Sequence, residues 1–102
     1  MRLIGVFTVL FSIVVVNFGF SVASAAAPAK AAQCIACHGP KGISVNPIWP
    51  NLAGQHKEYL VKQLKDFKAG TRVNPLMKPI VAGLTDKDFA EIAAYYAGLS
   101  CK

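Results

Sequence analysis

The pattern of apolar and polar positions predicts two clear helices in the second half of the chain. Residues 55–69 and residues 85–99 each carry apolar side chains at helical spacing on one side. Gly70 is the expected end of the first helix, and Thr85, with Asp88 three residues later, resembles a capping box at the start of the second. The apolar positions are Tyr59, Leu60, Leu64 and Phe67 in the first helix and Phe89, Ile92, Ala93 and Tyr96 in the second.

Glycine and proline interrupt the rest of this part of the chain. Residues 28–37 predict a short helix, whereas residues 39–54 and 70–84 have the composition of loops. No strand-like alternation is present, so we expect an all-α domain of three to four helices with long loops. Loops of this length are unusual in a compact domain unless something functional holds them, and a large flat apolar cofactor would serve. The first loop carries three apolar residues that we expect to pack inward: Ile48, Trp49 and Leu52.

The N-terminal segment has the pattern of a secretory leader. Arg2 precedes an almost unbroken apolar run over residues 3–20, which is followed by small residues. We expect cleavage after Ala25 or Ala27, which assigns residues 1–25 to a signal peptide and residues 26–102 to one small domain. The alternative is an uncleaved anchor, because the run is about long enough to span a bilayer.

Charge and cysteine content limit the possible functions of the remaining domain. The chain of 102 residues carries 11 Lys and Arg against 5 Asp and Glu, and losing Arg2 with the leader leaves a formal charge of +5. This excess favours acidic partners or an anionic surface, and nucleic acid is not expected outside the cytoplasm. A domain this small usually needs a stabilising cofactor, metal or disulfide. Three cysteines form an odd set in an oxidising compartment: Cys34, Cys37 and Cys101.

The stretch QCIACHG, residues 33–39, is compatible with three chemistries. A thiol–disulfide exchanger would use Cys34 and Cys37, but the expected strand–helix scaffold is missing and His38 would have no role. A zinc site would need a fourth ligand, with His56 or Cys101 available. Adjacent residues 37 and 38 point to different sides of a helix, so they converge poorly on one ion.

A c-type haem uses every part of the same motif. Residues three apart share a helix face, so Cys34 and Cys37 can each form a thioether to one porphyrin edge. His38 is then offset to reach the iron, and C-x-x-C-H is the attachment signature of such haems. Haem c with its iron is therefore the expected cofactor, and one haem accounts for the single motif.

A six-coordinate haem needs a second axial ligand, and the candidates are Met77 and His56. Met77 is the methionine that remains after the leader is removed, and it lies in an expected loop between Pro75 and Pro79. His56 stands at the start of a helix, where an exposed histidine is ordinary. We favour Met77, because histidine and methionine together ligate electron-transfer haems.

These motifs together resemble the class I c-type cytochromes. The similarity covers residues 31–99 and is closest to small bacterial one-haem members and to one half of the two-haem cytochrome c4. It rests on CIACHG, PNLAGQ at 50–55, YLVKQLKDFKAGTR, the downstream methionine and DFAEIAAYYAGL.

The resemblance implies a small class I fold packed around one covalently bound haem. Cys34 and Cys37 would carry the haem, and His38 and Met77 would be its axial ligands. Pro50 would offer its carbonyl to the free nitrogen of His38, with Pro47 as the competing position. The other implied residues are Asn74, which would hydrogen-bond near the Met77 sulfur, and Trp49, Tyr59 and Tyr96, which would pack in the core and the haem pocket.

A periplasmic one-electron carrier without enzymatic activity is the function that follows from this resemblance. Its partners would be an oxidase, peroxidase or dehydrogenase with an acidic docking surface, approached through Lys41 and Lys78. No stable membrane insertion is expected after cleavage. The alternatives are a haem subunit of a larger redox complex and a gas-binding or sensory protein with a labile methionine. Cys101 leaves both a monomer and a disulfide-linked dimer open.

Overall fold

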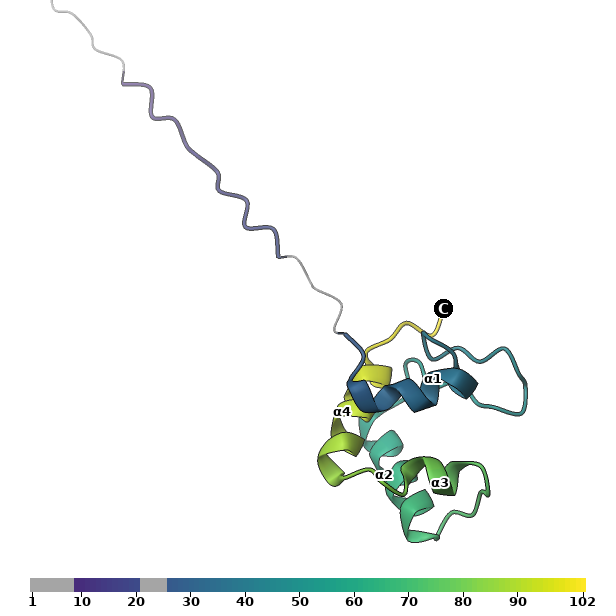
Figure 1. Ribbon diagram of the computed structural model, residues 1–102. Helices are drawn as coiled ribbons and strands as arrows, with labels where there is room; N and C mark the ends of the chain where they lie inside the picture. Colours follow the sequence, from purple (N-terminus) through teal and green to yellow (C-terminus); the bar gives the residue numbers. More distant parts are fainter. Residues whose placement is uncertain (1–8, 21–25) are drawn as a thin grey trace, which may run out of the picture.

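The computed structural model describes residues 9–20 and 26–102. The predicted all-α class is confirmed, because every regular element in these residues is helical and none is a strand. Residues 9–20 have no regular secondary structure, and the cleavage position after Ala25 lies outside the described residues. The elements are the 3₁₀ helix η1 (Ala29–Ala31) and the α-helices α1 (Ala32–His38), α2 (Lys57–Ala69), α3 (Met77–Val81) and α4 (Asp86–Ala97) (Figure 1).

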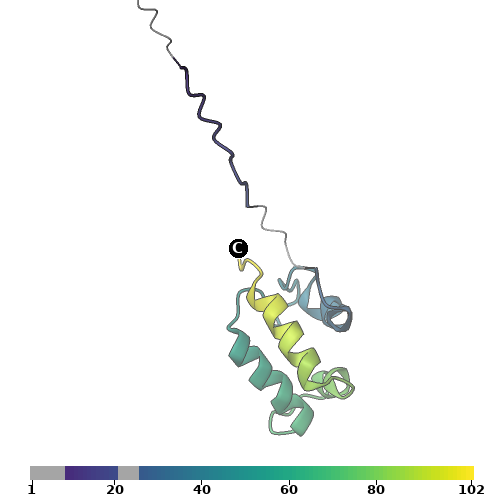
Figure 2. The same cartoon turned by 90° about the vertical axis from the view of Figure 1, so that its left-hand side faces the viewer.

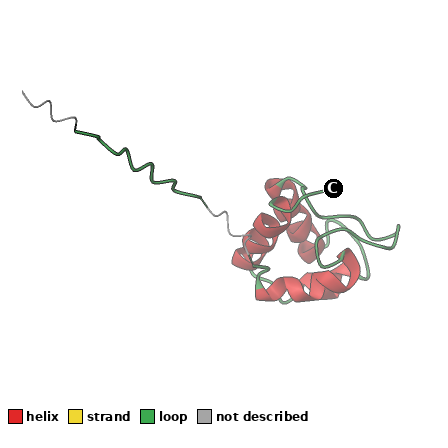
Figure 3. Ribbon diagram, turned by 90° about the horizontal axis from the view of Figure 1, so that it is seen from above, coloured by secondary structure: helices red, strands yellow, loops and turns green. Residues whose placement is uncertain are grey.

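Helices α2 and α4 form the central pair of the fold. They lie side by side and run in opposite directions (Figure 2). The 3₁₀ helix η1 packs against α4, and α3 packs against α2. Seen from above, the helices group together and loop segments extend to one side of them (Figure 3). The long loop between α1 and α2 lies beside α1, which carries the cysteine motif (Figure 1).

The core joins all of these helices. The apolar stripe of α4 is buried as its 3.6-residue periodicity predicts. Burial of this stripe against α2 removes large apolar side chains from water, which is the main stabilising term of such a small domain. The buried residues of the cluster are Ala31, Cys34, Leu60, Phe67, Val81, Leu84, Phe89, Ile92, Ala93 and Tyr96.

Helix α2 begins two residues later than the pattern predicts, because His56 has extended backbone angles and acts as its N-cap. Gly70 ends the helix as expected, with φ 84° in the left-handed region, where glycine has no steric penalty. Leu60 and Phe67 are buried, but Tyr59 is 48% exposed, so its expected place in the core is wrong.

The start of α4 agrees with the predicted capping box. The Asp88 backbone N–H donates to Thr85 Oγ1 at 3.2 Å, and the Thr85 N–H donates to an Asp88 carboxylate oxygen at 2.9 Å. Leu84 and Phe89, which flank the cap, are both buried in the core. This pairing of polar cap and apolar contact fixes where the helix begins.

The second expected loop contains a helix that periodicity did not reveal. Met77 is the first residue of the five-residue helix α3 rather than a loop residue. Pro79 is accommodated because the first turn of a helix does not need its N–H. Asn74 Oδ1 accepts hydrogen bonds from the backbone N–H groups of Leu76 and Met77 at 2.9 and 3.1 Å. Asn74 therefore bonds to the backbone at the start of α3 instead of the Met77 sulfur.

The inward packing expected of the first loop holds only in part. Leu52 packs against the core cluster, and Trp49 is half-buried. Ile48 is 74% exposed, so it does not pack against the protein core.

Candidate functional site

Helix α1 carries three functional side chains in its last turn and a half. Cys34 is buried, Cys37 is half-buried, and His38 is buried as the last residue of the helix. Cys34 and Cys37 are separated by three positions, which places both thiols on one side of α1. Gly39 ends the helix with φ 84°, and its N–H donates to the carbonyl of Ile35 at 2.9 Å. The motif is thus held on a rigid element rather than in a flexible loop.

The orientation of His38 is fixed by the loop that follows. Its Nδ1 atom lies 2.8 Å from the carbonyl oxygen of Pro50. A carbonyl oxygen only accepts, so Nδ1 carries the hydrogen and Nε2 keeps a free lone pair. Between the two prolines weighed from the sequence, this contact is made by Pro50 and not by Pro47. The arrangement leaves His38 Nε2 as the atom able to bind a metal.

Gly42 folds this loop back so that Pro50 reaches the end of α1. Its carbonyl accepts hydrogen bonds from the N–H groups of Leu52 and Ala53 at 2.8 and 3.1 Å. A Cβ atom at this position would lie 2.8 Å from the backbone nitrogen of Ala53 and 3.0 Å from the ring of Tyr96. Its φ of 70° also favours glycine. The loop composition of residues 39–54 gave no signal for this role of Gly42.

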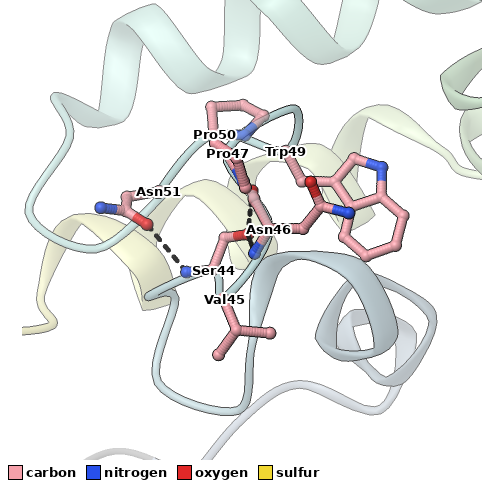
Figure 4. A pocket seen from close by; sticks show the side chains of 7 residues that line it. All are labelled: Ser44, Val45, Asn46, Pro47, Trp49, Pro50 and Asn51. Atoms are coloured by element: carbon pink, nitrogen blue, oxygen red, sulfur yellow. Dashed lines mark hydrogen bonds between the residues drawn. The ribbon is translucent and has the colours of Figure 1, made fainter.

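Polar side chains inside the same loop stabilise its shape (Figure 4). The Ser44 N–H donates to Asn51 Oδ1 at 2.8 Å, and the Asn46 N–H donates to Ser44 Oγ at 3.1 Å. A shallow cavity of about 390 Å³ lies over them, bordered by Val45, Pro47, Trp49 and Pro50 as well as these three residues. The Gly/Pro/Asn composition predicted a loop, but it contained no signal for this set of bonds.

Met77 reaches the core from a different element. It is half-buried at the start of α3 and packs against the core cluster. The structure joins His38 directly to Pro50, whereas no hydrogen bond links Met77 to either residue within the described ranges. His56 is exposed at the N-cap of α2, outside the core.

The environment of the two thiols bears on the exchanger and zinc alternatives. Burial raises the pKa of the Cys34 thiol, whereas disulfide exchangers depend on a lowered cysteine pKa. In the described part of the chain, no three His, Cys, Asp or Glu side chains gather to hold a metal ion. Thus neither alternative gains support from the arrangement of these side chains.

Comparison with known proteins places the motif in a family. The family model described as cytochrome c matches residues 22–100. The chain belongs to the cytochrome c family. This membership implies covalently bound haem c with its iron, and Cys34, Cys37 and His38 provide its attachment motif.

Relatives of this cytochrome differ in length. The chain is 59% identical over 64 residues to cytochrome c4 of Thiocapsa roseopersicina, covering 63% of this chain and 33% of that one. It is 44% identical over 77 residues to cytochrome c-554(548) of Halomonas halodenitrificans, covering 72% of this chain and 93% of that one. It is 40% identical over 73 residues to a thiosulfate dehydrogenase electron acceptor of Stutzerimonas stutzeri, covering 69% and 34% of the two chains. The chain therefore spans about a third of the cytochrome c4 relative.

A solved structure supports the same fold. Cytochrome c4 of Acidithiobacillus ferrooxidans matches with a TM-score of 0.62 and 42% identity, covering 65% of this chain and 38% of that one. The resemblance to class I cytochromes inferred from the motifs is thus confirmed, as is the small all-α cytochrome fold.

Features of this chain fit a haem next to α1. The Trp49 Nε1 atom is buried and lacks a hydrogen-bond partner within the described residues, so it is a donor without an acceptor. Apolar side chains on both long connections are exposed, namely Ile48, Val73 and Leu76. A large planar apolar group with polar substituents would cover such side chains and bring acceptors. The two thiols and the free Nε2 of His38 complete the set of groups required.

Proposed function

We propose that this cytochrome is a one-electron carrier with haem c held by α1 and by His38 and Met77. Haem c, when bound, supplies a ferric–ferrous couple that accepts and releases a single electron. The observation that carries the proposal is the 2.8 Å contact between His38 Nδ1 and the Pro50 carbonyl, because it directs Nε2 toward metal binding.

Each residue of the site has a separate task in this proposal. Cys34 and Cys37 would form the two thioether links, and His38 Nε2 and Met77 Sδ would hold the iron. The soft thioether of Met77 would favour the reduced state and raise the potential. Pro50 holds the imidazole in one tautomer and orientation. With both ligands supplied by the protein, the metal would have no place for a substrate, which argues against an enzyme.

The proposed location is the bacterial periplasm. The apolar run of residues 3–20 and the small residues after it support export and removal of residues 1–25. None of the helices within the described residues is long and apolar enough to cross a membrane. Mass spectrometry of the exported protein would identify the N-terminus and distinguish cleavage after Ala25 or Ala27 from a retained anchor.

Redox partners with acidic docking surfaces are proposed from the charge around the site. The segments 26–56 and 67–85, which flank the motif residues, contain basic side chains and no Asp or Glu. Lys41 and Lys78 are exposed in these segments. The name of the Stutzerimonas stutzeri relative supports a dehydrogenase as one class of electron donor.

Charge reversal tests this docking. Lys41→Glu and Lys78→Glu are expected to slow electron exchange with an acidic partner at low ionic strength, and added salt should reduce the difference. Lys87→Glu is the matched control, because Lys87 lies on α4 beside Glu91. Equal rates for all three variants would place the docking face elsewhere.

Cys101 is free and exposed at the C-terminal end of the chain. We propose a monomer as the working form, because exposed termini are usually poorly ordered. A band of doubled mass on a non-reducing gel, absent from Cys101→Ser, would instead establish the disulfide-linked dimer.

Absorption spectroscopy is the primary test of the carrier function. The protein is exported together with haem-maturation machinery, and oxidised and reduced spectra are recorded before and after addition of carbon monoxide. We expect haem that remains attached after denaturation, a ferric methionine–iron charge-transfer band, and no carbon monoxide binding. Attached haem that binds carbon monoxide and lacks this band would favour the gas-binding alternative. A chain without attached haem would overturn the proposal.

A further inference from the structure

Tyr96 connects three parts of the fold and has a polar group that the electron-carrier proposal does not use. It lies on α4 and is fully buried, with an exposed fraction of 0%. Its carbonyl accepts a hydrogen bond from the Gly54 N–H at 2.9 Å. Its ring lies so close to Gly42 that a Cβ there would be 3.0 Å from Cδ1. The ring and the backbone of Tyr96 therefore have little freedom to move.

The hydroxyl group of Tyr96 is buried together with the ring. Its oxygen has no hydrogen bond of regular geometry within the described part of the chain. A buried hydroxyl without a partner costs about 1–3 kcal/mol, so phenylalanine would be the better residue if packing were the only role. The hydroxyl therefore requires a partner that matters for the site.

Cys34 and Tyr96 belong to the same buried core cluster, and each side chain affects the pKa of the other, so the Cys34 sulfur is the polar atom in the surroundings of this hydroxyl. Burial raises the pKa of the Cys34 thiol, and the neighbouring Tyr96 hydroxyl lowers it in part. The pKa of Tyr96 is itself raised, first by burial and then by the nearby Cys34. The hydroxyl thus keeps its proton and can act as a donor at ordinary pH.

Haem attachment changes what the Cys34 sulfur can do. A thiol both donates and accepts hydrogen bonds weakly, so in the free chain the two groups compete to donate. A thioether sulfur has no proton and only accepts. After attachment, one direction of hydrogen bonding is left, from the Tyr96 hydroxyl to the sulfur.

We propose that Tyr96 is a positioning residue whose hydroxyl donates a hydrogen bond to the thioether sulfur of Cys34 in the haem-loaded protein. The inference rests on the proposed function, because it needs the thioether. The bond fixes the orientation of the sulfur on α1 relative to α4. It also withdraws electron density from the sulfur, which favours the reduced haem.

Tyr95 provides a matched control on the same helix. Its ring meets that of Tyr96 edge-on, with 5.1 Å between the centroids, and its side chain is half-buried. Tyr96→Phe and Tyr95→Phe each remove one hydroxyl and keep the ring. Only the first variant removes the donor next to Cys34.

The test uses resonance Raman spectra of the full haem-loaded protein prepared in H₂O and in D₂O. The carbon–sulfur stretching band of the Cys34 link is identified as the band lost in Cys34→Ala, which keeps the Cys37 link. We expect this band to shift in D₂O in the wild type and in Tyr95→Phe, but not in Tyr96→Phe. The midpoint potential should fall in Tyr96→Phe and remain unchanged in Tyr95→Phe.

Each outcome has a definite meaning. A carbon–sulfur band insensitive to D₂O in the wild type would overturn the inference, even if Tyr96→Phe failed to fold. A band and a potential unaffected by Tyr96→Phe would overturn it as well. A protein with attached haem and either of these results would retain the electron-carrier proposal, whereas a protein without attached haem would remove both.

Discussion

His38 and Pro50 are separated by twelve positions in the chain, yet the Nδ1 atom of His38 lies 2.8 Å from the Pro50 carbonyl oxygen. This hydrogen bond connects the end of α1 to the loop that precedes α2. It orients the imidazole before any metal binds, and it leaves Nε2 free. The geometry of the proposed iron ligand thus depends on a loop backbone and not on another side chain.

Loosening this loop is expected to alter the haem potential. Pro50→Gly keeps the carbonyl but frees the backbone, so the hydrogen bond from His38 should weaken and the imidazole should become a poorer electron donor. We expect a higher midpoint potential, measured by redox titration. Pro47→Gly in the same loop is the control, because its carbonyl does not accept from His38. Equal potentials in both variants would argue against the role of Pro50.

Removing the proposed second ligand is expected to open the iron. Met77→Ala should lose the ferric methionine–iron charge-transfer band, lower the midpoint potential and allow the ferrous protein to bind carbon monoxide. Leu76→Ala is the neighbouring control, since Leu76 is 62% exposed and carries no ligand atom. Retention of the charge-transfer band in Met77→Ala would assign the ligand to another residue, with His56 the first to examine.

Much of the fold could be predicted from local patterns. The buried stripe of α4 and the Thr85 cap follow from spacing and side-chain chemistry alone. The end of α2 at Gly70 follows from the rarity of left-handed backbone angles in other residues. Cys34 and His38 could be proposed as site residues from the sequence because their motif is contiguous in the chain.

The remaining features depend on contacts between distant residues. Helix α3 has only five residues and contains Pro79, so the sequence shows no helical periodicity there. The hydrogen bond from the Met77 N–H to Asn74 and packing against α2 account for its formation. Tyr59 and Ile48 were expected to be covered because they are apolar, but periodicity does not reveal which apolar side chains remain uncovered in the folded chain. The closeness of Tyr96 and Cys34 likewise required the folded structure.

Gly42 is expected to be intolerant of a side chain. In Gly42→Ala the new Cβ would meet the Ala53 backbone nitrogen at 2.8 Å, and φ of 70° adds strain. We expect a loss of roughly 1–3 kcal/mol in the free energy of unfolding, the range typical of overpacking, measured by urea denaturation of the haem-loaded protein. Gly83→Ala is the control, because nothing lies within 4 Å of its new Cβ. Similar losses in both variants would contradict the steric explanation.

Removing the N-terminal cap of α4 is expected to lower the stability of the protein by less than the Gly42 substitution does. Thr85→Ala removes the oxygen that accepts from the Asp88 N–H. A lost cap of this kind costs about 1 kcal/mol, which thermal unfolding of the haem-loaded protein can measure. Thr85→Ser keeps the hydroxyl and should recover most of the stability. A Ser variant as unstable as the Ala variant would show that the methyl group, rather than the cap, is responsible.

Asp88 makes the same cap dependent on pH. Its pKa is lowered in the folded protein, first because the Thr85 backbone N–H donates to the carboxylate. Because the pKa of Asp88 is lower in the folded protein, its ionised carboxylate stabilises the fold at pH values above the pKa of Asp in the unfolded chain, about 3.9. This stabilisation is lost as the pH falls through the pKa of Asp88 in the folded protein. Asp88→Asn should therefore be less stable than the wild type near neutral pH, with the difference shrinking in acid. Urea denaturation over this pH range measures it, with Asp86→Asn as the control because Asp86 lies in the same turn outside the capping box. A difference independent of pH would exclude the carboxylate charge as its source.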